Sequence, residues 1–406
     1  MALVLAGLMA ARAEDPINTR LSSILKAYDK RELTDDSTES HQKWLASASG
    51  QADAAFLGEH YERLPEDRKR DVPTELARTG KDAVLPLIKS ALADPEVGPQ
   101  VFPGLFYACR VFGSQTGPTF RKEAAESLLP WVKADGSKAS ESAIEILPFM
   151  DVSAAAKTLL HDDFLSPGSP SVYAVLSSCN EAGMTIPQPR IRQWLETWKP
   201  SARGARKAHE NARLYRQAVI ALAVHHADEA MDLAKAVVAK DPTEGDFYHS
   251  VPLAAAGLTG LYDRLCDFHD DGKKFEALPE PARIYFALTY FVADSENGGI
   301  GQALGNSTGD LLPLVRKGYQ EVGDPRGASH LEAMLKPFGP AGPSLDRAER
   351  NRQMEAMEPD FWTQEDDLGE AWAKEWEDKP WVSTTWLLGL YANKHAAVLK
   401  PLMQQQ

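Results

Sequence analysis

Two clusters of histidine and acidic residues have spacings that could hold a metal ion. His225 and Glu229 are four residues apart, which places both on one face of a helix. No third ligand accompanies them, so a histidine pair at a helix end is the favoured interpretation. The run from Asp267 to Gly272 is acidic, but it lacks the length and the closing glutamate of a calcium loop. The sequence therefore predicts no metal site.

The cysteines and the paired glycines also lack a catalytic context. Cys109, Cys179 and Cys266 stand far apart, and buried packing is their default interpretation. Gly298 and Gly299 could present backbone N–H groups to an anion, yet no Lys-Ser/Thr pair follows, as a nucleotide-phosphate loop requires. We predict no cofactor and no catalytic residue. The sequence leaves the question of an enzyme open, with the balance against one.

A group of glycines and polar residues lies between positions 297 and 310. It comprises Asn297, Gly298, Gly299, Gln302, Asn306, Ser307, Gly309 and Asp310. The glycine pair is expected to break a helix, and Asp310 is expected to cap the N-terminus of the next one, with Pro313 in its first turn. One hypothesis is that Asn297, Gln302, Asn306 and Asp310 form a pocket that binds or hydrolyses a ligand.

The order and spacing of these residues resemble a motif of a bacterial domain of unknown function, Asn-Gly-Gly…Gln…Asn-Ser-x-Gly. The resemblance covers about residues 281–380 and continues through Val322-Gly-Asp-Pro325 and residues 361–368. Ile300 stands where the family usually has an aromatic residue. That domain forms the C-terminal part of a small acidic DNA-mimic protein. The resemblance therefore implies a compact helical domain and, as partner, a basic DNA-binding protein.

An acidic segment follows the motif. Ten acids and one base, Lys374, lie between Glu355 and Asp378. If residues 366–378 are helical, one apolar stripe contains Leu368, Ala371, Trp372 and Trp376. The opposite face then contains Asp366, Glu370 and Glu377, which we predict as candidates for binding a protein partner. The alternative is an ordinary solvated face over a core anchored by tryptophan.

Helical elements are expected throughout the chain. From about residue 20 to 280, apolar residues recur at helical spacing, and units start near 83, 126, 155, 191 and 230. Steps of this size are typical of HEAT-like helical hairpins, and a non-repeating helical domain is the alternative. We predict an all-α fold with a HEAT-like helical array at 20–280 and a compact helical domain at 281–406. Such an array would offer a concave face to a protein partner.

Composition narrows the choice of partner and compartment. The 406 residues carry a formal net charge of −14, which argues against direct binding of nucleic acid. The chain has no apolar run long enough to span a membrane. Residues 1–13 form an apolar segment ending in Ala11-Arg12-Ala13, which predicts a cleaved signal peptide. This favours export, periplasmic or secreted, and a cytoplasmic protein with a short apolar N-terminal helix is the alternative.

Two functions follow from these observations. The first is a non-enzymatic protein-interaction module with an acidic surface that mimics DNA. The second is an exported protein with a ligand-binding or hydrolytic site at the Asn297–Asp310 loop.

Overall fold

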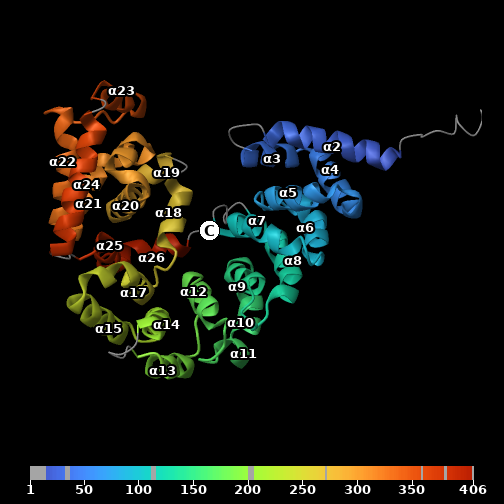
Figure 1. The fold of residues 1–406 in the computed structure, drawn as a ribbon, viewed down its shortest axis with the longest axis horizontal. Helices are drawn as coiled ribbons and strands as arrows, with labels where there is room; N and C mark the ends of the chain where they lie inside the picture. The colour runs from blue at the N-terminus through green and yellow to red at the C-terminus, as the bar shows by residue number, and fades with distance from the viewer. Residues whose placement is uncertain are drawn as a thin grey trace, which may run out of the picture. The chain divides into compact units, whose positions relative to one another are not determined.

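The structure is a computed structural model that describes residues 15–32, 37–110, 116–199, 205–269, 272–357, 360–378 and 382–404. Within these ranges every regular element is a helix, which confirms the predicted all-α fold. The chain divides into two compact units, Met1–Ser178 and Cys179–Gln406 (Figure 1). The domain boundary expected near residue 280 stays a prediction. The expected signal peptide lies outside the described residues.

Unit 1 is built from short helices that alternate between two rows. Helices α4, α6 and α8 pack on one another in one row, and α5, α7 and α9 pack in the other. The HEAT-like interpretation of this arrangement stays a prediction. The elements of unit 1 are α2 (Pro16–Glu32), α3 (Ser37–Leu45), α4 (Ala48–Glu59), η1 (Tyr61–Arg63), α5 (Glu66–Ala77), η2 (Asp82–Val84), α6 (Leu85–Ala93), α7 (Gly98–Arg110), α8 (Pro118–Leu128), η3 (Leu129–Trp131), α9 (Lys138–Met150), α10 (Val152–Leu159) and α11 (Asp162–Leu165).

Proline determines where several helices end. Helix α6 ends at Ala93, directly before Asp94-Pro95, because proline disfavours the helical conformation in the residue before it. Helix α8 ends at Leu128 and tightens into η3, which contains Pro130. Pro130 has no N–H to donate to the carbonyl four residues earlier, which favours the end of the α-helix at this point.

Unit 2 begins within α12 (Val172–Glu181) and contains the acidic segment and the glycine motif. Its elements are α13 (Gln188–Thr197), α14 (Ala205–His225), α15 (Ala227–Lys240), η4 (Pro242–Glu244), α16 (Gly245–Tyr248), α17 (Ser250–Ala255), α18 (Leu261–His269), α19 (Gly272–Glu276), α20 (Glu280–Gly305), η5 (Ser307–Leu311), α21 (Leu312–Val322), α22 (Pro325–Leu335), η6 (Lys336–Phe338), α23 (Arg347–Met357), α24 (Asp360–Asp378), α25 (Thr384–Lys394) and α26 (Ala396–Gln404).

Helix α20 is the central element of unit 2. It contacts α18, α21, α22, α23, α24, α25 and α26. Its first half is buried on nearly every side, with a run of core residues from Ile284 to Leu288. A helix that is apolar all round needs partners on all sides to keep water out. The position of the glycine motif is therefore fixed by a helix whose first half is packed into the core of the unit.

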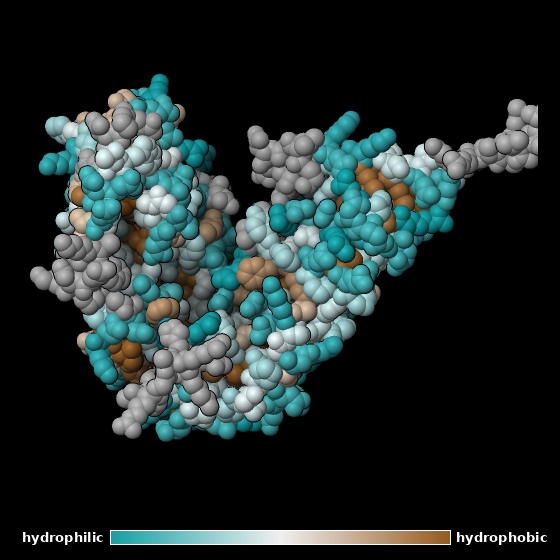
Figure 2. Space-filling model, viewed as in Figure 1, coloured by the Kyte–Doolittle hydropathy of each residue, from teal (hydrophilic) through white to brown (hydrophobic). Residues whose placement is uncertain are grey.

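The large hydrophobic side chains that reach the surface are scattered. Three of these side chains are more than half exposed: Val152 on α10, Phe247 on α16 and Leu345 in the loop before α23. Figure 2 shows hydrophobic residues as small patches among hydrophilic ones on the visible face. Single exposed apolar residues are ordinary on soluble proteins. On the described surface, charged groups are therefore better candidates for a binding site than apolar ones.

Candidate functional site

The glycine pair of the motif breaks α20, as the sequence predicts. Gly298 and Gly299 have non-helical backbone angles, and the helix continues after them in a new direction to Gly305. Gly299 has a φ of +86°, which a residue with a side chain adopts only with strain. Asn297 lies exposed at this kink. The second half of the helix is thereby turned so that its polar side chains face the first half.

Asp294, on the first half of α20, is the centre of this contact. Its carboxylate accepts hydrogen bonds from Asn306 Nδ2 at 3.0 Å, from Gln302 Nε2 at 3.3 Å and from Thr308 Oγ1 at 2.6 Å. Asp294 and Thr308 were missing from the residues singled out in the sequence. Ser307 contacts the first half separately, through a 3.1 Å hydrogen bond with the hydroxyl of Tyr290.

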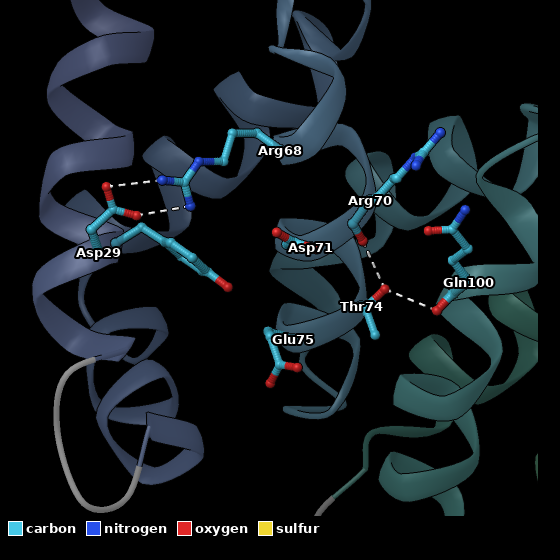
Figure 3. A pocket seen from close by; sticks show the side chains of 8 residues that line it. Asp29, Arg68, Arg70, Asp71, Thr74, Glu75 and Gln100 are labelled. Atoms are coloured by element: carbon cyan, nitrogen blue, oxygen red, sulfur yellow. Dashed lines mark hydrogen bonds and ion pairs between the residues drawn. The ribbon is translucent and has the colours of Figure 1, made fainter.

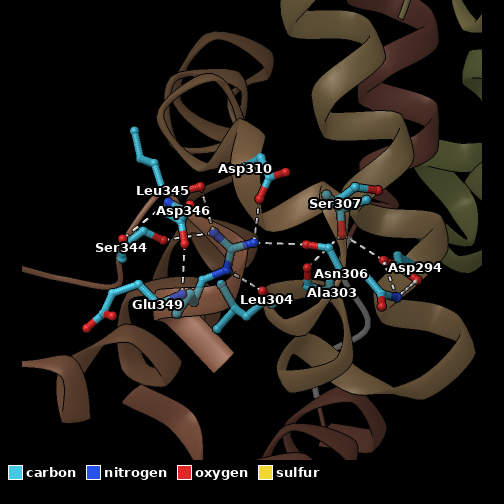
Figure 4. Close-up of polar contacts among 12 residues, drawn as sticks. Asp294, Ala303, Leu304, Asn306, Ser307, Asp310, Ser344, Leu345, Asp346 and Glu349 are labelled. Carbon is cyan, nitrogen blue, oxygen red and sulfur yellow. Dashed lines mark hydrogen bonds and ion pairs between the residues drawn. The ribbon is translucent and has the colours of Figure 1, made fainter. Parts of the chain in front are cut away.

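A buried arginine from α23 holds the other side of the same turn. The side chain of Arg350 is fully buried, and its guanidinium donates to backbone carbonyls of both segments that it joins. Figure 4 labels accepting residues of both segments, among them Leu304 and Ser344. Nη2 bonds to the carbonyl of Asn306 at 3.0 Å and to the carboxylate of Asp310 at 2.6 Å. Three further carbonyls accept from it: Leu304, Ser344 and Leu345.

The structure assigns Gly309 and Asp310 to this contact rather than to helix capping. A Cβ on Gly309 would lie 2.7 Å from Arg350 Nε and 2.5 Å from the carbonyl oxygen of Leu304. The expected N-cap role of Asp310 is wrong: the residue lies inside η5, and Leu311 precedes α21 without a side-chain cap. Because the guanidinium is buried, pairing with it outweighs capping an accessible helix end. Pro313 does lie in the first turn of α21, as expected.

A second side chain enters the motif from α24. The carboxylate of Glu365 is half-buried and accepts a 2.6 Å hydrogen bond from the backbone N–H of Gly301. The pKa of Glu365 is raised on balance. Burial raises it more than the hydrogen bonds from the backbone N–H groups of Gly301 and Ile300 lower it. Glycine lets Glu365 keep this position, since a Cβ on Gly299 or Gly301 would lie 2.4 or 2.3 Å from a carboxylate oxygen.

The motif thus forms two receptor positions within unit 2, one for Arg350 and one for Glu365. Gln302, Asn306 and Asp310 make hydrogen bonds or an ion pair within this network. Its chemistry is that of structural hydrogen bonding. The hypothesis of a ligand-binding or hydrolytic pocket finds no supporting observation among the described residues.

The acidic segment is helical, as predicted, since α24 spans residues 360–378. Asp366 and Glu370 are exposed, as is Asp367, and one helical turn of about 6 Å separates the first two along the axis. The side chain of Glu377 lies outside the described residues, as do those of Trp372 and Trp376. On the opposite face Leu368 packs against the core. Ala371 was expected in the same stripe but is exposed.

The other chemical candidates are occupied in structural contacts. His225 Nε2 lies 2.7 Å from the carbonyl oxygen of Ile186, and Glu229 forms an ion pair with Arg192. Burial raises the pKa of Cys109 and of Cys179 to about 12, so both are protonated at neutral pH and weak nucleophiles.

An open polar groove of about 610 Å³ lies within unit 1, between α2, α5 and α7 (Figure 3). Arg68 pairs with Asp29 across it at 3.0 Å. Thr74 Oγ1 donates to the carbonyls of Arg70 and Gln100, at 2.8 and 2.9 Å. The exposed charges of both signs along this groove give no net preference for a ligand.

The segment that contains the motif and the acidic helix matches a known protein family. Residues 276–395 match the family of DMP19-like proteins. This confirms the predicted resemblance and extends it beyond residues 281–380. The DMP19-like segment runs from just before α20 to the end of α25, so it includes Arg350, Glu365 and the exposed acids of α24. No curated protein and no solved structure matches the chain.

The helices of the described residues include none that is both long and apolar enough to cross a membrane.

Proposed function

We propose that this protein is a non-enzymatic interaction module whose acidic helix α24 mimics the phosphate backbone of DNA and occupies a basic DNA-binding protein. The observation that carries the proposal is the exposed group Asp366, Asp367 and Glu370, named here the acidic face. It lies on the helix that Glu365 joins to the family motif. The match to DMP19-like proteins, named after a DNA mimic, supports it.

The spacing of the acidic face is compatible with this role. Asp366 and Glu370 are about 6 Å apart along the helix axis. Phosphates of one DNA strand follow each other at about 3.4 Å along the duplex axis, so two steps span a similar length. Like charges on one face repel, and a partner's lysine and arginine side chains would relieve that repulsion. Binding should therefore weaken as salt concentration rises.

Capture of DNA-binding proteins from the source organism tests the proposal. Proteins eluted from a DNA column are passed over the immobilised chain, and bound material is released with duplex DNA. We expect to capture a DNA-binding protein that is released by duplex DNA and whose binding to the chain weakens as the salt concentration rises. Binding that duplex DNA does not displace would contradict the proposal.

A matched pair of triple variants shows whether the acidic face is responsible. D366N/D367N/E370Q neutralises it, and E96Q/D163N/E276Q removes the same charge from exposed acids elsewhere. At roughly 0.5 kcal/mol for each exposed ion pair, the first variant loses about 1.5 kcal/mol, or about tenfold in affinity. The second is expected to bind nearly as well as the natural sequence. Equal losses in both variants would mean that only net charge matters.

The compartment is part of the proposal, because a DNA-binding partner places the working protein in the cytoplasm. The predicted signal peptide points the other way, to a basic partner in the envelope. The intact mass of the protein from its own host, measured with the fraction in which it is found, separates these. A chain that begins at Glu14 outside the cytoplasm would contradict the DNA-mimic function.

A further inference from the structure

We propose that Glu365 is a positioning residue: it holds the acidic helix in its orientation, whereas Asp366, Asp367 and Glu370 contact the partner. This inference rests on the proposed function. It divides the four acids of α24 whose side chains the structure describes into one that faces inward and three that face outward. The two kinds should respond differently to substitution, although all four are carboxylates within two turns of one helix.

The contacts of α24 separate the two kinds. Phe361 is 1% exposed and packs edge-on against Phe338, with ring centroids 5.8 Å apart. Leu368, seven residues later, is partly buried against the same core. Glu365 lies four residues after Phe361 and three before Leu368, so all three share one face of the helix. The acidic face points away from that side.

Glu365 supplies the directional contact among these three. The apolar contacts of Phe361 and Leu368 tolerate small rotations of the helix, because hydrophobic burial has little directionality. A hydrogen bond requires a defined distance and angle. The bond from Gly301 N–H to Glu365 Oε1 at 2.6 Å therefore fixes the rotation of α24 about its axis, and with it the direction of the acidic face.

The glycines opposite Glu365 are what allow this contact. Gly299 and Gly301 approach the carboxylate so closely that a Cβ on either would push the carboxylate out of this position. What Glu365 contributes is an oxygen at the right distance, and its charge is not required. Glutamine carries an amide oxygen at the same position, while alanine carries none and aspartate is one methylene too short.

Variants at Glu365 and Asp366 test the inference. Their binding to a captured partner is measured, and their hydrogen exchange can be measured before any partner is known. E365A is expected to weaken binding about tenfold. E365Q should remain within about twofold of the natural sequence, even though it also removes a negative charge. D366N should weaken binding and make its salt dependence shallower. In hydrogen exchange, E365A should speed exchange of the α24 amides, while E365Q and D366N should not.

Some outcomes would overturn the inference. If E365Q binds as weakly as E365A, with a shallower salt dependence, Glu365 acts as a charge toward the partner. If E365A binds and exchanges like the natural sequence, the contact positions nothing. If E365A does not fold, E365D replaces it: it keeps the charge, and weaker binding with an unchanged salt dependence is expected. A natural chain without salt-dependent binding would contradict the proposed function, and the exchange measurements would then decide the role of Glu365 separately.

Discussion

Replacing Arg350 tests whether the motif is a structural receptor for a buried cation. The side chain is fully buried, and Arg350→Ala removes every hydrogen bond that it donates to α20 and to the segment before α23. Asp310 would be left without its partner, although its side chain is 43% exposed and water can solvate it. The carbonyl of Leu304, a buried residue, would be left without this donor.

The expected loss of stability follows from these contacts. A buried acceptor left without a donor costs about 1–3 kcal/mol. More than one carbonyl loses its donor, and truncating a fully buried side chain also leaves a cavity, so the total is about 3–5 kcal/mol. We therefore expect Arg350→Ala to lower the free energy of unfolding by about 3–5 kcal/mol. Arg350→Lys keeps the charge but lacks the planar fork that reaches several acceptors, so its loss should be intermediate.

Urea unfolding followed by tryptophan fluorescence measures this loss. Five of the nine tryptophans lie in the last 45 residues, so the signal reports largely on unit 2. Arg352→Ala is the matched control, because Arg352 lies on the same helix, is 69% exposed and pairs only with Glu349 among the described ion pairs. Its effect should stay within about 0.5 kcal/mol. An Arg350→Ala protein within about 1 kcal/mol of the natural one would refute the reasoning.

Four further predictions concern unit 2. Gly369→Ala should stabilise α24 by up to about 1 kcal/mol, since its Cβ meets open space. Gly389→Ala should destabilise the fold, because its Cβ would lie 2.6 Å from the carbonyl oxygen of His249, and thermal unfolding compares the two. Asn306→Asp should place a carboxylate against Asp294, lowering stability at neutral pH and restoring part of it in acid, where a proton relieves the repulsion. Equal stability of this variant across pH would contradict the contact. Burial raises the pKa of Glu365 above its ordinary value of 4.5, so its protonated form favours folding, and that advantage is lost as pH rises through the folded-state pKa. The stability of Glu365→Gln relative to the natural protein should therefore increase between about pH 4 and about pH 7, and a decrease would contradict it.

Local features of the fold were predictable from the sequence. The break at Gly298 and Gly299 follows from the properties of glycine itself, and the end of α6 before Pro95 follows from those of proline. Asp346 caps α23 by accepting a 2.9 Å bond from the N–H of Glu349, three residues later, which is the usual spacing of an N-cap contact. In each case the decisive atoms are only a few residues apart, so the local sequence contains the information.

The partners of the motif could not be predicted in the same way. Arg350 lies 44 residues after Asn306, and Glu365 lies 64 residues after Gly301. Nothing in the sequence around either residue distinguishes it from an exposed charge on an amphipathic helix. Asp310 shows the consequence, since a local rule assigns it to a helix cap and the tertiary fold pairs it with a buried guanidinium. One feature of the sequence could have pointed to Asp294. It is a carboxylate that precedes the glycine pair on the same helix as Gln302, so a break at the glycines can bring it close to the amide side chains that follow.

Displacement of DNA tests the central claim most directly. A captured DNA-binding protein is first bound to fluorescent duplex DNA. The natural chain or one of its variants is then added in increasing amounts while the fluorescence anisotropy of the DNA is recorded. The natural chain and E96Q/D163N/E276Q should release the DNA at similar concentrations, and D366N/D367N/E370Q should need about ten times more. Release at the same concentration by all three, or by none, would contradict the claim that the acidic face of α24 takes the place of DNA.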